Sequence, residues 1–279
     1  MPRGISLHIG LNSVDSTQYS GWAGELNACE ADAHDMISIA RKAGFSATGI
    51  LTKDATAVSV LDTLHDAAGE LAAGDTLLVT YSGHGGQIPD MNGDEEDSND
   101  ETWVLYDRQV LDDELNLAYS VFAAGVRIAV FSDSCHSGTV TRLGPPVPVG
   151  ASAGSVLMPS ADNYGARTRA MPAAVAQRDY LQRHEMYGGL RTAGETAGEP
   201  QACVALISGC QDNQLSLDGT YNGLFTATLL TVWNGGQFRG GYRRLRNQVS
   251  SRMPASQTPR FSYTGPNDKK FLAGQPFSL

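Results

Sequence analysis

Two apolar runs that each end in a polar turn containing glycine place the strongest constraint on this chain. The first is Thr76-Leu-Leu-Val-Thr-Tyr-Ser-Gly-His-Gly-Gly86, and the second is Arg127-Ile-Ala-Val-Phe-Ser-Asp-Ser-Cys-His-Ser-Gly138. Apolar and β-branched runs of this length are typical of strands buried on both faces, as in a parallel sheet. Functional residues of open α/β sheets gather beyond the carboxyl ends of the strands, so we expect the two turns to lie side by side.

The turns carry one imidazole and one thiol, at His84 and Cys135. A cysteine attacks as its thiolate and has a free pKa of about 8.5, so it needs an adjacent base or cation. The flanking glycines let a substrate backbone approach closely. We predict that His84 is the general base and Cys135 the nucleophile of a dyad, since no third orienting side chain stands out. The amides of Gly85 and Cys135 are the expected oxyanion hole, each donor being worth about 3 kcal/mol.

Other histidines and cysteines fit these roles less well. His136 follows the nucleophile directly, and adjacent residues of an extended strand point to opposite faces, so we assign it a structural role. Cys203 follows Gln-Ala but opens an apolar run, which is typical of a core residue. Cys29 and Cys210 are interpreted as packing residues, and the alternative for Cys135 is the same inert role.

Four motifs in this order resemble a metacaspase, a caspase-like cysteine peptidase: Ser82-Gly-His-Gly-Gly-Gln87, Asp94-Glu-Glu-Asp97, Leu111-Asp-Asp-Glu-Leu115 and Asp133-Ser-Cys-His-Ser-Gly138. The His-to-Cys separation, 135 − 84 = 51 residues, also fits the caspase-type spacing of about 50. The similarity runs from about residue 5 to residue 271. It implies a caspase-like α/β fold, with a central, mostly parallel six-stranded sheet flanked by helices on both faces. It also implies an endopeptidase that acts on proteins or peptides and carries no prodomain, of prokaryotic type.

The resemblance further implies a substrate pocket lined by Asp133, by Asp32 in a Cys-x-x-Asp-Ala stretch, and by Ser82. Two partly desolvated carboxylates attract a guanidinium or ammonium and repel an acidic side chain, which predicts cleavage after Arg or Lys. Two alternatives stay open from the residues alone. Asp32 can serve only the N-terminus of its own helix, and Asp133 can serve only its own turn.

An acidic run at residues 90–101 holds seven carboxylates. Oxygen-rich loops suit Ca²⁺, although a charge run is more often a solvated surface. The resemblance implies calcium activation, with ligands at Asp97, Asp100, Asp112 and Asp113. The further acidic residue that the family carries after the cysteine motif is absent, because Thr139-Val-Thr-Arg-Leu143 contains only a base.

Composition restricts the partners and the compartment. A formal charge of −10 and a pI near 5.0 argue against nucleic acid. No run approaches the ~20 apolar residues of a membrane span. Four irregularly spaced cysteines without a signal-like start predict free thiols in a reducing, cytoplasmic setting. A monomer is the favoured oligomeric state.

We expect one peptidase domain over residues 1–279, with an insertion at about 143–200 that is rich in Pro, Gly, Ala, Ser and Arg. Long loops are commonly functional, and this one offers a site of self-cleavage after one of its arginines: Arg142, Arg167, Arg169, Arg178, Arg183 or Arg191. Two other functions stay open. They are a non-catalytic protein-binding module, and an acyltransferase or transpeptidase that uses the same acyl-enzyme.

The remaining elements follow from hydrophobic periodicity. Besides the two runs above, strands are predicted at residues 5–11, 45–51, 203–208 and 261–264. Helices are predicted from Asp32 to a stop at Gly44 and at residues 55–71, 111–124, 173–187, 221–233 and 242–253.

Overall fold

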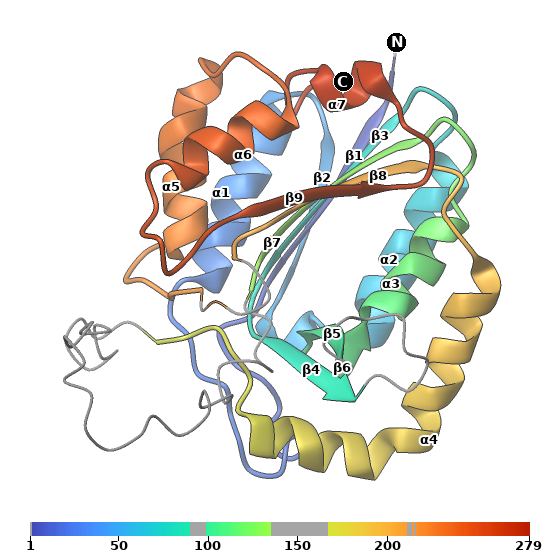
Figure 1. Ribbon diagram of the computed structural model, residues 1–279, viewed down its shortest axis with the longest axis vertical. Coiled ribbons are helices and arrows are strands. Elements are labelled where there is room, and N and C mark those ends of the chain that lie inside the picture. Colours follow the sequence, from blue (N-terminus) through green and yellow to red (C-terminus); the bar gives the residue numbers. More distant parts are fainter. Residues whose placement is uncertain (1, 90–98, 135–166, 211–213, 215) are drawn as a thin grey trace, which may run out of the picture.

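A computed structural model describes residues 2–89, 99–134, 167–210, 214 and 216–279. The predicted six-stranded sheet is confirmed, and its strands lie in the order β2-β1-β3-β7-β8-β9. All pairs are parallel except the last, between β8 and β9 (Figure 1). The strands are β1 (Gly4–Gly10), β2 (Ser46–Leu51), β3 (Thr76–Ser82), β7 (Arg127–Asp133), β8 (Cys203–Ser208) and β9 (Arg260–Thr264).

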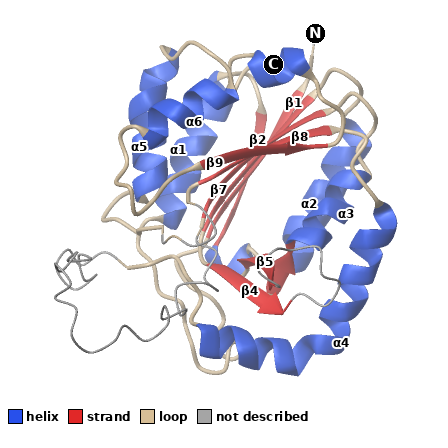
Figure 2. Ribbon diagram, viewed as in Figure 1, coloured by secondary structure: helices blue, strands red, loops and turns tan. Residues whose placement is uncertain are grey.

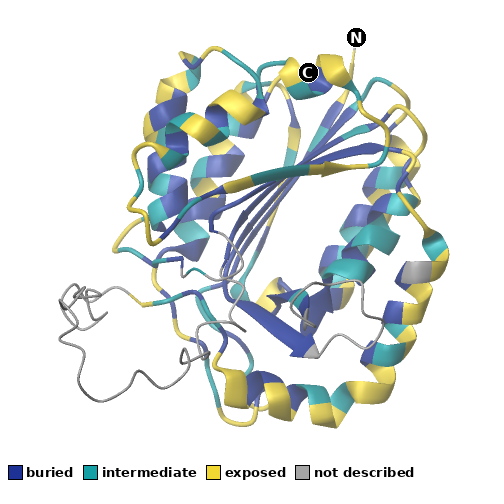
Figure 3. Cartoon of the chain, viewed as in Figure 1, coloured by how far each residue is buried: buried dark blue, intermediate teal, exposed yellow. Residues whose placement is uncertain are grey.

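Helices cover both faces of this sheet, as Figure 2 shows. One face is covered by α1 (Cys29–Lys42), α5 (Leu224–Trp233) and α6 (Tyr242–Ser250), with α7 (Lys269–Ala273) at its end. The other is covered by α2 (Ala57–Glu70) and α3 (Asp112–Ser120). Each face carries its own apolar core. Strand β3 is buried throughout and β7 is buried after its first residue, which is the pattern that their apolar runs predict (Figure 3).

The alternation of side chains along β3 and β7 decides which residues can reach the site. Tyr81 packs in the core of the α2 and α3 face, whereas Leu78 packs in the core of the α1 face. Ser82 therefore points to the same side as Leu78, because side chains of a strand repeat every two residues. Ser82 is in register with Asp133 on β7, so both face the helix layer that begins with α1.

A second, three-stranded sheet was not predicted. It consists of β4 (Gly85–Pro89), β5 (Asn99–Val104) and β6 (Gln109–Leu111), paired antiparallel. The sequence gives little sign of this sheet, because its strands are short. Neither Gly85–Pro89 nor Asn99–Val104 shows an alternating apolar pattern. The long helix α4 (Ala173–Ala197) lies beside this sheet and against α3 (Figure 1).

The boundaries of several helices differ from the predicted ones. The helix predicted at 173–187 is present and runs on to Ala197. Helix α5 begins at Leu224 rather than residue 221, because Gly223 has an extended backbone and forms its N-cap. Helix α2 begins after Thr56, whose side chain accepts a hydrogen bond from the Ser59 amide in a capping box. Within the described part of the chain, no helix combines the length and apolar character that crossing a bilayer requires.

Candidate active site

His84 lies two residues beyond the end of β3. Hydrogen bonds to its backbone carbonyl and to its ring fix its position. Its carbonyl accepts hydrogen bonds from the Tyr81 hydroxyl at 2.6 Å and from the Val104 amide at 3.0 Å. Its Nε2 lies 3.0 Å from the carbonyl oxygen of Gly24, and the Trp22 ring packs on it at 4.8 Å between centroids. A carbonyl can only accept, so Nε2 carries the proton and Nδ1 is the basic nitrogen.

The His84 imidazole is buried, and its burial favours the neutral form of the ring. Burial lowers the pKa of His84 to about 4, against the hydrogen bond to the Gly24 backbone, which raises it. Nδ1 is buried and has no hydrogen-bond partner among the described residues. The neutral imidazole leaves Nδ1 as a proton acceptor, and its lowered pKa makes this nitrogen a weaker base than that of an exposed histidine.

The Gly24 carbonyl is the orienting group that the sequence did not reveal. A backbone carbonyl leaves no residue-type signal, and Gly24 precedes His84 by sixty residues. Gly24 has φ +53°, and a Cβ there would lie 3.2 Å from Cδ2 of His84. The hydrogen bond to this backbone oxygen fixes the tautomer and the orientation of the His84 ring.

We expect Gly24→Ala to lower the turnover of peptide substrates about tenfold and to leave their KM nearly unchanged. The substitution adds a strained backbone, which costs on the order of 1–2 kcal/mol, and shifts the His84 ring. Gly74→Ala is the matched control, because Gly74 has φ +92° and no atom within 4 Å of its Cβ position. Equal turnover in steady-state assays of the two variants would contradict the role of Gly24.

Cys135 and His136 lie outside the described residues. The residues that lead to Cys135 are described, and they confirm that the two predicted turns begin side by side. Ser82 and Asp133 are directly paired across β3 and β7, and His84 and Cys135 each follow two positions later. Of the other cysteines, Cys29, Cys203 and Cys210 are buried and form no disulfide among the described residues, in accord with packing roles. Burial raises the pKa of the Cys29 thiol to about 12, which makes it inert.

Asp32, Ser82 and Asp133 meet in one buried pocket, and the guanidinium of Arg169 fills it. Nη2 of Arg169 lies 2.8 Å from Oδ2 of Asp32, and Nη1 lies 3.0 Å from Oδ2 of Asp133. Nη1 also donates to Oγ of Ser82 at 2.8 Å and to the Asp133 carbonyl at 3.1 Å. The arginine is fully buried. The three predicted side chains are therefore arranged around an arginine of the same chain.

Two further pocket residues were missed from the sequence. Asp218 supplies a third carboxylate, with Oδ1 3.0 Å from Nη2 of Arg169. Gly223 forms a wall of the pocket, because a Cβ there would lie 2.6 Å from Cζ and both terminal nitrogens of the guanidinium. Both lie in the loop between β8 and α5, and only the folded chain brings that loop onto the ends of β3 and β7.

The carboxylates are fixed by hydrogen bonds that do not depend on Arg169. Asp32 accepts from the Ser82 hydroxyl at 2.7 Å, and Asp133 accepts from the Thr226 hydroxyl at 2.8 Å. Asp218 accepts from the Asn27 amide at 2.6 Å. Burial raises the pKa of Asp32 to about 6 although Arg169 opposes the shift. Burial also disfavours the charged guanidinium, but the surrounding carboxylates hold the pKa of Arg169 well above its usual value.

The amide of Gly85, predicted as an oxyanion-hole donor, points at a carbonyl. It donates a hydrogen bond to the carbonyl oxygen of Arg169 at 2.9 Å. The residue whose side chain fills the carboxylate pocket therefore presents its own carbonyl group to this donor. The second predicted donor, the Cys135 amide, lies outside the described residues.

The predicted calcium ligands do not form a prepared cation site in the part of the chain that the structure describes. Asp97 lies outside that part, and Asp100 is buried in an ion pair with Arg191 of α4. Oδ1 of Asp112 accepts from the Asp113 amide at 2.9 Å. No group of three or more His, Cys, Asp or Glu residues could hold a metal ion among the described residues.

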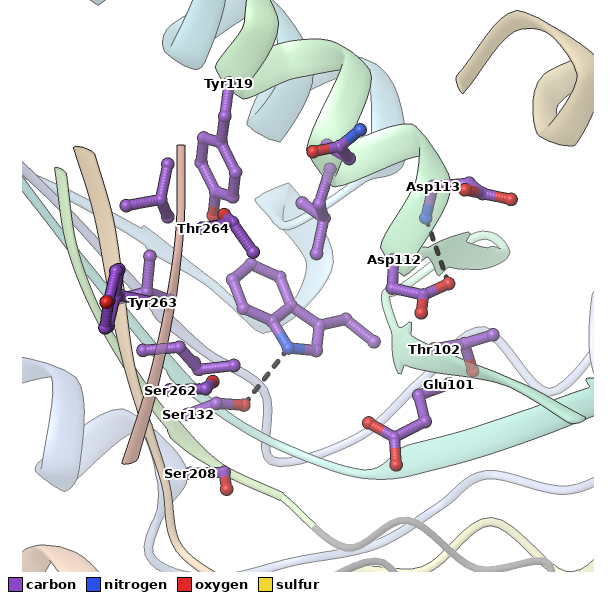
Figure 4. Close-up of a pocket in the computed structure, with 16 residues that line it drawn as sticks. Glu101, Thr102, Asp112, Asp113, Tyr119, Ser132, Ser208, Ser262, Tyr263 and Thr264 are labelled. Carbon is purple, nitrogen blue, oxygen red and sulfur yellow. Dashed lines mark hydrogen bonds between the residues drawn. The ribbon is translucent and has the colours of Figure 1, made fainter. Parts of the chain in front are cut away.

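A separate cavity of about 370 Å³ lies between α3 and the sheet (Figure 4). Glu101, Asp112 and Asp113 are among the residues that line it, together with Tyr119, and most of the lining surface is apolar. The Trp103 indole in its wall donates to the Ser132 hydroxyl at 3.1 Å. None of the residues around Arg169 lines this cavity, so it is not the carboxylate pocket.

Comparison with known proteins identifies the family and the fold of this chain. The caspase domain matches residues 13–271. The structure superposes on caspase-1 of Spodoptera frugiperda with a TM-score of 0.56 at 13% identity, over 95% of this chain and 86% of that one, which shows a shared fold. The chain belongs to the caspase-domain family and is a cysteine-type peptidase.

Several proteins of similar sequence are metacaspases. The chain is 31% identical to metacaspase-1 of Mycosarcoma maydis over 96% of its length and 72% of that protein. It is 30% identical to metacaspase-1 of Ajellomyces capsulatus over 80% of its length and 68% of that protein. The crystal structure of protein GSU0716 from Geobacter sulfurreducens matches with a TM-score of 0.84 and 47% identity, over 100% of this chain and 99% of that one. The resemblance stated from the four motifs is confirmed.

Proposed function

We propose that the protein is an endopeptidase that cleaves after Arg or Lys through an acyl-enzyme formed by His84 and Cys135. The observation that carries this proposal is the pocket of Asp32, Asp133 and Asp218 around a guanidinium, close to a histidine with a free, neutral nitrogen. Buried carboxylates without a cation are costly, so the pocket selects a basic side chain and repels an acidic one.

In the proposed mechanism, Nδ1 of His84 takes the thiol proton and the thiolate attacks the carbonyl carbon after the bound basic residue. The oxyanion receives a hydrogen bond from the Gly85 amide, whose direction toward a carbonyl supports this role. The imidazolium then protonates the leaving amine, and water hydrolyses the thioester. The Gly24 carbonyl holds the ring in position throughout.

A peptide with one internal arginine tests this function against the two alternatives. In plain buffer, a hydrolase releases one new N-terminus per cut, which amine-reactive labelling and mass spectrometry detect. A protein-binding module leaves the peptide intact. A transpeptidase needs an added amine and transfers the acyl part to it. We expect hydrolysis at the arginine, and an intact peptide would contradict the proposal.

Calcium activation stays a proposal that stands on the acidic run and on the resemblance to metacaspases. Arg191 already neutralises Asp100, so a bound ion has to compete with this guanidinium. We expect Ca²⁺ to raise peptidase activity, and Arg191→Gln to lower the Ca²⁺ concentration needed for half-maximal activation. Arg178→Gln is the matched control on an exposed position of the same helix. Calorimetry without binding heat, together with kinetics unchanged by a chelator, would remove calcium from the proposal.

Self-processing in the insertion is also proposed, because the peptidase and the arginines lie in one chain. The cytoplasmic location stays a prediction from the cysteine pattern, and the monomeric state stays a prediction. Sedimentation of the purified protein at several concentrations measures the latter.

A further inference from the structure

The cavity of about 370 Å³ between α3 and the sheet takes no part in the proposed catalytic mechanism. Its volume lies within the range of small-molecule pockets, which is about 300–1,000 Å³. Its floor consists of alternate residues of three neighbouring strands: Val130 and Ser132 of β7, Val204, Leu206 and Ser208 of β8, and Ser262 and Thr264 of β9. The strand register places these side chains on one face of the sheet, and Val130 and Val204 pack there in the core of the α2 and α3 face.

One polar group in this cavity has no partner. Tyr119 lines the cavity from α3, and its side chain is directed from the helix into it (Figure 4). The residue is 7% exposed, and its hydroxyl is buried without a hydrogen-bond partner among the described residues. Buried polar groups nearly always have a partner, because leaving one unpaired destabilises the folded chain. The Tyr119 hydroxyl therefore points to a bound molecule that carries a hydrogen-bonding atom.

The other lining residues determine the charge of that molecule. Of the 16 described residues that line the cavity, Glu101, Asp112 and Asp113 are acidic and none is basic. Figure 4 shows Asp112 and Asp113 on one side of the cavity and Tyr119 on the other. Carboxylates attract a cation and repel an anion, and the indole of Trp103 adds an aromatic surface. The lining fits a small molecule with a protonated amine at one end, an aromatic body and a hydroxyl at the other end.

Trp103 connects the cavity to both halves of the predicted catalytic pair. Its indole stacks on the Tyr81 ring, with 4.5 Å between centroids and 8° between planes, and the Tyr81 hydroxyl donates to the His84 carbonyl at 2.6 Å. The indole N–H donates to the Ser132 hydroxyl at 3.1 Å, and this hydroxyl lies 3.0 Å from the hydroxyl of Ser134, the residue before the predicted nucleophile. A molecule packed against Trp103 therefore restricts the side chains that position both catalytic groups.

We propose that this cavity binds a small hydroxylated aromatic amine and that the bound amine raises the peptidase activity. Its ammonium group faces the carboxylates, its ring packs against Trp103, and its hydroxyl forms a hydrogen bond with Tyr119. The binding site stands independently of the proposed function, whereas the effect on activity rests on it. Activity rises because a filled cavity holds the Trp103 indole, and through Tyr81 the His84 backbone, in one position.

Titration calorimetry of the purified protein with three related compounds tests the ligand class. A chelator is present throughout, so that Ca²⁺ does not compete for Asp112 and Asp113. We expect one equivalent of tyramine to bind. The amine 2-phenylethylamine lacks the hydroxyl and should bind about fivefold more weakly, the effect of one hydrogen bond. The acid 3-(4-hydroxyphenyl)propionate has a carboxylate in place of the amine and should not bind detectably. Equal binding of all three, or no saturable binding of tyramine, would overturn the proposal.

Two tyrosine variants test the hydrogen bond. Tyr119→Phe should bind tyramine and 2-phenylethylamine equally well, and its Tm should not fall, because the lost hydroxyl has no partner among the described residues. Tyr187→Phe is the matched control, since its hydroxyl lies outside the cavity and donates to Asp179 at 2.6 Å. This control should keep the fivefold preference and have a lower Tm. An unchanged preference in Tyr119→Phe would contradict the assigned contact.

A cavity-filling variant locates the bound amine. Ser262 lies on the edge strand β9 and is half-buried, so Ser262→Trp should fill the cavity and abolish the binding of tyramine. Ser262→Ala leaves the cavity open and should bind normally. Undiminished binding in a folded Ser262→Trp protein would place the amine elsewhere, such as in the carboxylate pocket around Arg169, and would overturn the site. If Ser262→Trp does not fold, the comparison of the two amines in Tyr119→Phe still decides the question.

Steady-state hydrolysis of an arginine peptide tests the effect on activity. We expect saturating tyramine to raise kcat at least twofold in the wild type and to have no effect in Ser262→Trp. An unchanged kcat, or a rise in KM alone through competition for the carboxylate pocket, would overturn the effect on activity and leave the binding site standing. A protein that binds tyramine but cuts no arginine peptide, with or without the amine, would overturn the proposed function instead.

Discussion

Replacing Cys135 by alanine is expected to reduce the hydrolysis of arginine peptides by a factor of about 10³ or more, with folding unchanged. Without the thiolate no acyl-enzyme forms, and the remaining donors and pocket supply only a small residual rate, as in other nucleophilic enzymes. His84→Ala should cause a loss of similar size, because its Nδ1 is the basic nitrogen free to take the thiol proton. Residues that act as one unit give losses that do not add.

The control for this prediction is Cys203→Ala, which removes a thiol buried in the central sheet at the start of β8. We expect that variant to retain its peptidase activity. The measurements are steady-state rates on a fluorogenic arginine peptide and thermal unfolding of each variant. A purified Cys135→Ala protein with wild-type activity would end the proposal that this cysteine is the nucleophile.

A peptide with Arg before the cut is expected to be hydrolysed at least about tenfold faster than its Lys counterpart, and a matched Asp peptide should not be cut detectably. The pocket binds the two terminal nitrogens of Arg169 differently: Nη1 faces Ser82 and Asp133, and Nη2 faces Asp32 and Asp218. A single ammonium cannot occupy both positions. Losing one hydrogen bond to a charged group costs about 1.5–3 kcal/mol, which corresponds to the stated ratio.

Gly223→Ala tests the same pocket without changing any charge. Its Cβ would overlap the guanidinium position, so arginine peptides should lose most of their kcat/KM and Arg169 should be displaced. Gly69→Ala in α2 is the matched control, because no atom lies within 4 Å of its Cβ position and its helix favours alanine. Asp218→Asn should reduce the Arg rate and the Arg-to-Lys ratio. Unchanged preference in both variants would contradict this assignment of the pocket.

The sequence by itself determined the framework of this protein. Apolar runs such as Thr76–Ser82 and Arg127–Asp133 show no alternation, which is typical of strands covered on both faces. Because parallel strands end at one edge, the runs also predicted that Ser82 and Asp133 lie together, which their register confirms. Residue type at fixed positions was enough for these conclusions, since they depend on local periodicity and on short motifs.

Only the tertiary structure decided how the site is completed. The Gly24 carbonyl on His84 has no side-chain signal, because every residue carries a carbonyl. Asp218 is one of thirty acidic residues in the chain, and nothing near it in sequence marks it as part of the pocket. Arg169 is one of several arginines in the insertion, and only the folded chain places its guanidinium among Asp32, Asp133 and Asp218. Each of these contacts joins segments far apart in the chain, so its geometry depends on long-range packing and not on local periodicity.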